Sequence, residues 1–150
     1  MHDFVQIAPD VYARRGIPLD AVGRAQAAVH WTKGAGVLVG LSAAVLWGTA
    51  WIEADSPAEV ALPNSRKAPS GIRVIQARIA RHERCEVNGF PVTTPVRTAF
   101  DLGCRLQRDR AVQVIDALCR ATKLAPSTIS AFADEHPGAR GCAQLRALLP

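Results

Sequence analysis

Arginine side chains gather in one short stretch of the chain and are the residues best suited to bind an anion. Arg73, Arg78, Arg81 and Arg84, with His82 among them, form its densest basic segment. A guanidinium group presents a planar fork of donors that matches a phosphate, and a concentrated positive patch is what binding to a nucleic-acid backbone requires. The same pattern also fits an ordinary solvated surface. Two interpretations therefore stay open: a phosphate-binding patch, and a charged face without a ligand.

Another pair of arginines lies near the N-terminus. Arg14 and Arg15 fall at the end of two short alternating runs, Phe4–Ala8 and Val11–Arg14, whose spacing predicts a β-hairpin. Hairpins that serve as wings beside a DNA-reading helix commonly lie against the DNA backbone. Arg14 and Arg15 are therefore the second candidates for phosphate contacts.

A different arginine is paired in sequence with an acid. Thr94 and Pro95 predict the start of a helix, because threonine can cap the free N–H groups and proline is tolerated at the first helical position. Arg97 and Asp101 stand four residues apart on that helix, so they share one face and can form an ion pair. Either Arg97 contacts a nucleic acid or a partner, or the pair fixes the helix against the preceding hairpin. We favour the structural pair.

The sequence holds no arrangement of nucleophile, base or metal ligands that would support catalysis. Its four cysteines are too widely spaced for a CxxC knuckle, and its four histidines are equally scattered. The cysteines are Cys85, Cys104, Cys119 and Cys142. A Gly-rich phosphate loop, a nucleophile elbow and a Ser-His-Asp or Cys-His set are all missing. We therefore predict a protein that is not an enzyme and that has no metal, cofactor or small-molecule ligand.

The elements that must position these residues are strands in the first two thirds of the chain and helices in the last third. The strands are predicted at Glu59–Leu62, Ile72–Ala77, and Arg84–Val87 with Phe90–Val92, the last two joined by the hairpin turn Asn88-Gly89. Helices are predicted at Leu19–Thr32, from Thr94 to about Cys104, and at Asp109–Thr122, Ser127–Glu135 and Ala139–Leu149. This order predicts an α+β fold, with a small mixed or antiparallel sheet and a C-terminal cluster of helices.

One run, from Gly34 to Ile52, contains no charged residue and has borderline length for a membrane span. Its apolar character divides into a β-branched piece, Val37–Leu41, and a helix-like piece, Ala43–Trp47, with Ser42 between them as a natural N-cap. A buried turn and helix in a water-soluble core explain this division better than a membrane helix does. Since no signal peptide precedes the run, we expect a cytoplasmic protein with no membrane partner.

Composition describes an ordinary globular chain with a positive charge. Of its 150 residues, 49% are hydrophobic and only 5% aromatic, so the core must be built from Ala, Val, Leu and Ile. The formal net charge of +5 favours association with nucleic acid, although a GC-rich genome also produces arginine-rich proteins.

The run GFPVTTPVRTAFDLGCRL, from Gly89 to Leu106, resembles the middle module of the AbiEi-type antitoxin family, the antitoxins of a type IV toxin–antitoxin, or abortive-infection, system. Three more stretches are similar to that family in the same order: APDVYARRG (Ala8–Gly16), LSAAVLWG (Leu41–Gly48) and HPGARGCAQLRALLP (His136–Pro150). The set resembles an actinobacterial branch in which a winged helix-turn-helix, this α/β module and a Vsr-type nuclease-fold domain follow one another. Thr94, Pro95, Arg97 and Asp101 match the structural motif of the family.

The resemblance implies a chain shortened at both ends relative to such members. Residues 1–16 would be a wing-like hairpin remaining from the winged helix, and residues 17–150 the AbiEi-like module. It implies a non-catalytic antitoxin-like regulatory or interaction module, whose partners are double-stranded DNA and, at the level of the operon, a nucleotidyltransferase-type toxin. Two alternatives remain: an accessory fragment of a Vsr-like endonuclease-fold protein that lacks its catalytic domain, and an inactive remnant.

Overall fold

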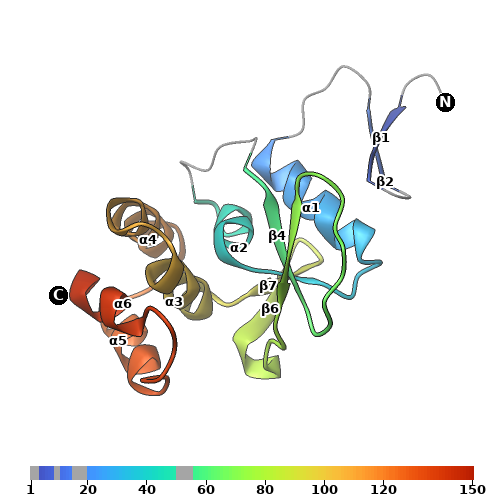
Figure 1. The fold of residues 1–150 in the computed structure, drawn as a ribbon. Coiled ribbons are helices and arrows are strands. Elements are labelled where there is room, and N and C mark those ends of the chain that lie inside the picture. The colour runs from blue at the N-terminus through green and yellow to red at the C-terminus, as the bar shows by residue number, and fades with distance from the viewer. Residues whose placement is uncertain (1–3, 9–10, 15–19, 50–55) are drawn as a thin grey trace.

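The computed structural model describes residues 4–8, 11–14, 20–49 and 56–150. The helices are α1 (Ala21–Trp31), α2 (Gly40–Leu46), α3 (Pro95–Arg105), α4 (Arg108–Thr122), α5 (Pro126–Asp134) and α6 (Cys142–Leu148). The strands are β1 (Phe4–Ala8), β2 (Val11–Arg14), β3 (Val37–Leu38), β4 (Ala58–Leu62), β5 (Ile72–Gln76), β6 (Arg84–Val87) and β7 (Phe90–Thr93), and a short 3-10 helix, η1, spans Arg81–Glu83. Helices α3 to α6 lie together on one side of the sheet, which confirms the α+β class with a C-terminal helical cluster (Figure 1).

The main sheet is mixed, which is one of the two arrangements predicted. Its strand order is β5-β4-β3-β7-β6; β3 runs antiparallel to β4 and parallel to β7, while β4 and β5 are parallel and β6 and β7 antiparallel. The β6–β7 turn confirms the Asn-Gly prediction, because Asn88 (φ 52°) and Gly89 (φ 83°) both take the positive φ that a type I′ turn requires. The predicted N-terminal hairpin is also present, as the antiparallel pair β1–β2.

Helix α1 covers one face of this sheet. The strand register places Leu38, Val60 and Val92 side by side, and all three are completely buried. They pack on the apolar side of α1, around Ala25 and Ala28. Burying one such aliphatic side chain contributes about 1.5–3 kcal/mol, so this face is a main source of stability.

The opposite face of the sheet is crossed by a loop. Val37 and Ala61 pair in register on this face, and Ile75 lies beside them on β5. Because β5 and β6 occupy opposite edges, the residues that connect them (77–83, the crossover segment) must pass across the sheet. The segment starts with a hydrogen bond of 2.9 Å from the Ala77 N–H to the Leu62 carbonyl.

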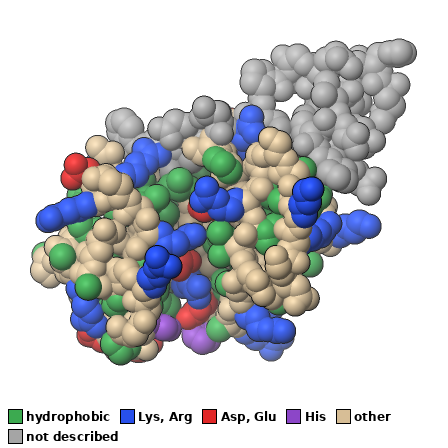
Figure 2. All heavy atoms as spheres, viewed as in Figure 1, with side chains coloured by type: hydrophobic (Ala, Val, Ile, Leu, Met, Phe, Trp, Pro, Cys, Tyr) green, Lys and Arg blue, Asp and Glu red, His purple; other side chains and the backbone are tan. Residues whose placement is uncertain are grey.

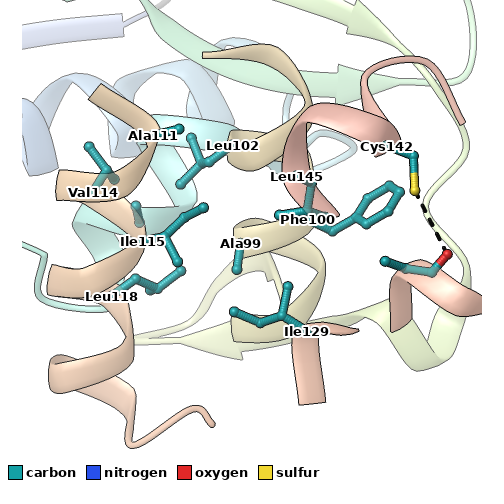
Figure 3. Packing of buried hydrophobic residues seen from close by; sticks show 12 residues of the cluster. Ala99, Phe100, Leu102, Ala111, Val114, Ile115, Leu118, Ile129, Cys142 and Leu145 are labelled. Carbon is teal, nitrogen blue, oxygen red and sulfur yellow. Dashed lines mark hydrogen bonds between the residues drawn. The ribbon is translucent and has the colours of Figure 1, made fainter. Parts of the chain in front are cut away.

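The C-terminal helices enclose a second core of their own. Leu102 of α3, Leu118 of α4, Ile129 of α5 and Leu145 of α6 converge there with no more than 1% exposure (Figure 3). Helix α6 approaches α3 so closely that a Cβ at position 141 would collide with backbone atoms of α3, and Gly141 also takes a positive φ of 83°. Only glycine meets both demands at this position.

Helix α2 begins differently from the prediction, and the expected N-cap at Ser42 was wrong. The helix starts at Gly40, and its capping residue Val39 offers no side-chain acceptor. The acceptor comes from β4 instead: the Leu41 N–H donates to Oε1 of Glu59 at 3.3 Å, while the Glu59 N–H donates to Oγ of Ser42 at 2.8 Å. Ser42 therefore ties the helix to the sheet rather than capping it.

Two predicted boundaries also moved. The β-branched piece yields only a two-residue strand, because α2 already starts at Gly40, and α6 begins at Cys142 rather than Ala139, because the left-handed Gly141 directly precedes it. None of the helices in the described ranges is long and apolar enough to cross a membrane. The part of the uncharged run that the structure describes folds as a strand and a buried helix.

Candidate functional site

Two buried glutamates lie where the sheet meets the helical cluster. Glu59 on β4 and Glu83 at the end of η1 are only 8% and 6% exposed. A buried carboxylate needs cationic or hydrogen-bonding partners to stay ionised. Oε2 of Glu59 lies 3.5 Å from Nη1 of Arg73 and 3.7 Å from Nη1 of Arg105 on α3. Glu59 thus joins three elements, since it also accepts from the start of α2.

Glu83 is held by the arginine of the predicted helical pair. Arg97 donates from Nη1 to Oε2 of Glu83 at 2.5 Å and from Nε to Oδ1 of Asp101 at 3.0 Å. Thr94 caps the same helix by accepting from the Arg97 N–H at 3.4 Å, and Pro95 occupies its first turn. The predicted ion pair is therefore formed, and it connects α3 to the entrance of the β6–β7 hairpin.

Two histidines that are far apart in the sequence also meet at Glu83. Nε2 of His82 lies 3.8 Å and Nε2 of His136 lies 3.9 Å from Oε1 of Glu83. His136 stacks on Phe132, with ring centroids 4.4 Å apart, and comes from the helical cluster. Figure 2 shows this meeting of charges, with basic, acidic and histidine side chains gathered between the two halves of the molecule.

The charge states within the pair follow from its burial. Burial works against the charge of Arg97, but the attraction of Asp101 and the hydrogen bonds to Asp101 and Glu83 together raise the pKa of Arg97 above its ordinary value. Burial also raises the pKa of Asp101, and the charge of Arg97 offsets this only in part. The Arg97 guanidinium is therefore charged. For Asp101, by contrast, the desolvation of the carboxylate outweighs the stabilisation that Arg97 provides.

The arginines of the crossover segment and of the first position of β6 are in a different state. Arg78, Arg81 and Arg84 are all exposed, and within the described ranges no ion pair engages them. Arg78 and Arg84 line a groove of about 260 Å³ (the arginine groove) together with the apolar side chains of Val37, Ala61, Pro63 and Ile79. Among the first group of candidates, Arg73 is also exposed but is paired with Glu59, so its charge is already engaged.

A second cavity lies on the other side of the crossover segment. Its volume is about 130 Å³, and Arg97, Asp101 and Arg105 line it on the side of α3. Ala77 and Ile79 belong to both cavities, so the crossover segment separates them. On one side of the segment the arginines are therefore neutralised by carboxylates, and on the other side no described carboxylate pairs with the guanidinium groups.

Burial lowers the reactivity of three of the four thiols. Burial raises the pKa of Cys104 to about 11 and also raises the pKa values of Cys85 and Cys119. A thiol with a raised pKa stays protonated and is a poor nucleophile or metal ligand at neutral pH. In the part of the chain that the structure describes, no group of three or more His, Cys, Asp or Glu residues could hold a metal ion.

The sequence-based candidates therefore separate into three groups. Thr94, Pro95, Arg97 and Asp101 come together as one motif. Arg78, Arg81 and Arg84 share the crossover segment and β6, whereas the side chains of Arg14 and Arg15 lie outside the described residues. Sequence reasoning missed Glu59 and Glu83. The available signal was weak: Glu83 is the one acid within the basic run Arg81–Arg84, and Glu59 interrupts an otherwise apolar strand.

The geometry is that of an α+β module built around an arginine–carboxylate junction. The family model of the AbiEi antitoxin C-terminal domain matches residues 34–150, which is most of the chain. The protein therefore belongs to the AbiEi antitoxin C-terminal domain family, and is an antitoxin-like module of a toxin–antitoxin or abortive-infection type of system.

The chain is also similar to two proteins whose names state no function. The uncharacterized proteins MT2308 and Rv2248, from two strains of Mycobacterium tuberculosis, are each 37% identical to it over 89 residues. That match covers 59% of this chain but only 32% of each relative, so the match involves about a third of their length. No solved structure matches the chain.

Proposed function

We propose that this chain is a non-catalytic antitoxin module of a type IV toxin–antitoxin system in the cytoplasm, and that it associates with double-stranded DNA through the phosphate backbone. Its toxin would be of the nucleotidyltransferase type and encoded in the same operon. The family membership supports the antitoxin role. The proposed DNA contact is supported by a difference between two sets of arginines. Arg78, Arg81 and Arg84 face solvent. Arg97 and Arg105 instead form ion pairs with carboxylates.

The same pairing supports a non-catalytic role. A general base or metal ligand needs a carboxylate that can reach a substrate or ion. Glu59, Glu83 and Asp101 are instead each bound to at least one arginine, and the two glutamates are buried. Their arrangement suits the joining of two halves of a fold.

Binding of a short DNA duplex at increasing salt tests the DNA contact. Three phosphate contacts predict a slope of log affinity against log salt of roughly −3. Replacing Arg78, Arg81 and Arg84 together by alanine should remove most of that slope. A matched control replaces Arg108, Arg120 and Arg140, which are exposed in the helical half, and so loses the same charge. Equal loss of slope in both triple variants would show that net charge, rather than the crossover segment, attracts the DNA.

The antitoxin role has its own test. Co-expression with the nucleotidyltransferase-type toxin of its operon should restore growth of the host cells. Failure to restore growth, at a level of soluble protein that is verified in the same cells, would contradict the antitoxin role.

A further inference from the structure

The two edge strands of the five-stranded sheet are protected to different degrees. An edge strand presents a row of backbone N–H and C=O groups, and proteins usually protect it with proline, a bulge or charged side chains. The edge strand β6 has the charged side chains of Arg84 and Glu86 at its exposed positions, and the Arg84 N–H is already bonded to the carbonyl of Arg81. The opposite edge strand, β5, contains no proline and pairs with β4 over its whole length without a bulge. We call the outer side of β5 the open edge.

The single charged side chain of β5 does not guard this edge. Nη1 of Arg73 lies 3.5 Å from Oε2 of Glu59 on the neighbouring strand β4, so its charge is engaged within the sheet. The other side chains of β5 are uncharged, and three of them, Ile72, Val74 and Ile75, are β-branched and only partly buried. Such residues favour strand pairing. The composition of β5 therefore promotes pairing and offers no device against it.

The backbone groups of β5 divide between its two sides. Successive residues of a strand direct their N–H and C=O groups to alternate sides. The Ala77 N–H donates to the Leu62 carbonyl of β4, so the odd-numbered residues of this segment face β4 and the even-numbered ones face outward. Within the described ranges, no hydrogen bond engages the outward N–H of Val74 or of Gln76. The open edge therefore presents free donors at positions 74 and 76, next to the outward carbonyls of residues 72, 74 and 76.

We propose that the open edge pairs with the open edge of a second copy of this chain, in antiparallel register about a twofold axis at Val74, so that the two sheets become one. In this register the Val74 N–H donates to the Val74 carbonyl of the second copy, the Gln76 N–H donates to the Ile72 carbonyl of the second copy, and symmetry repeats both bonds. An unpaired strand edge selects another extended strand as its partner.

The side chains favour a second copy over an unrelated strand. In the twofold register Val74 lies opposite its own equivalent, which is an aliphatic pair, and Arg73 lies opposite Ile75, so that no like charges are directly opposed. Cross-strand pairs of this kind stabilise a sheet, whereas like charges directly opposite each other destabilise it. The inference does not depend on the proposed DNA contact, because it uses none of the arginines assigned to DNA.

Sedimentation equilibrium of the purified chain is the first test. The mass of one chain is 16.0 kDa, and the average mass should rise toward twice that value as the concentration increases from micromolar to submillimolar. An average mass that stays at 16.0 kDa over this range would overturn the proposal.

Amide hydrogen exchange, read by NMR over the same concentrations, locates the contact. The N–H groups of Arg73 and Ile75 face β4 and should be protected at every concentration. Those of Val74 and Gln76 should exchange rapidly in the single chain and about tenfold more slowly once about nine tenths of the chains are paired. A rise in mass without this slowing would place the contact elsewhere on the molecule and would also overturn the proposal.

A substitution at Gln76 removes one donor toward the second copy. Proline is tolerated on an edge strand where its nitrogen faces away from the sheet, so Gln76→Pro should spare the pairing with β4. It should weaken the association at least about tenfold, because the bond and its symmetry equivalent are both lost. The matched control, Gln76→Ala, keeps the N–H and changes only an exposed side chain, so its association should equal that of the wild type.

Equal association of Gln76→Pro and Gln76→Ala would show that the open edge is not the interface. Thermal circular dichroism verifies that Gln76→Pro is folded. If it is not, the exchange rates of Val74 and Gln76 in the unsubstituted protein decide the question.

Discussion

The arginines on the two sides of the crossover segment differ in what holds them. Arg97 and Arg105 point toward carboxylates of β4, of η1 and of α3 itself, and they connect the two halves of the fold. Arg78 and Arg84 border a groove with no acid in its described lining. The residue type is the same and the distance along the chain is short. The position of Glu59 and Glu83, rather than the number of arginines, therefore decides which of them stabilise the fold and which are available to a partner.

The largest effect is expected from Arg97→Ala. Its loss leaves Glu83, which is 6% exposed, without its closest cation and removes the partner of Asp101. Breaking a buried pair costs about 3–5 kcal/mol, and because the Arg97 side chain is 21% exposed we expect a value near the lower end, about 3 kcal/mol. For a chain of this size that corresponds to a fall in melting temperature of about 6–12 °C.

Calorimetry or thermal circular dichroism measures this fall. An unchanged melting temperature together with lost binding of DNA would reverse the assignment, because Arg97 would then belong with the binding arginines.

A smaller effect is expected from Glu59→Gln. The amide keeps an oxygen for the Leu41 N–H but loses its charge toward Arg73 and Arg105. Those two side chains are 63% and 39% exposed, so each pair is screened by water, and we expect a total cost of about 1 kcal/mol. Denaturant unfolding should show a loss clearly below that of Arg97→Ala. A loss as large as that of Arg97→Ala would show that Glu59, and not Glu83, is the main connection between the halves.

Asp101→Asn should have a smaller effect still, with a dependence on pH that has a definite sign. Burial raises the pKa of Asp101 in the folded protein, so the folded state takes up this proton before the unfolded state does as the pH falls. The wild type should therefore gain stability relative to Asp101→Asn as the pH is lowered from neutrality toward the ordinary carboxyl pKa of 3.8. Urea unfolding of both proteins between those limits measures the difference. A gain for the variant on acidification would mean that the ion pair, rather than burial, dominates Asp101.

Much of this architecture could be predicted from the sequence because its signals are local. Asn88-Gly89 specifies its turn without help from the rest of the chain, and Thr94-Pro95 specifies the start of α3. The four-residue spacing of Arg97 and Asp101 likewise gave the correct pair. These predictions needed only backbone preferences and the geometry of one helix turn.

The remainder could not be predicted because it depends on contacts between distant segments. The cap of α2 comes from Glu59 on a strand 18 residues later, so Ser42 looked like the cap although its oxygen binds β4 instead. The meeting of His82 and His136 at Glu83 depends on how the helical cluster packs on the sheet. The arginine groove depends on the strand order, which places β5 and β6 at opposite edges and sends residues 77–83 across one face.

The smallest effect on stability, and the sharpest test of the comparison, is expected from Arg81→Ala. This side chain is exposed and forms no ion pair with the described residues, and substitutions of that kind change the free energy of unfolding by no more than about 0.5 kcal/mol. Each lost phosphate contact should nevertheless lower the magnitude of the salt slope for duplex binding by about 1. The variant thus keeps its fold and loses part of its binding, whereas Arg97→Ala loses stability. A melting temperature that falls as far in Arg81→Ala as in Arg97→Ala would mean that the crossover arginines also hold the fold together, and the distinction between the two sides of the segment would be wrong.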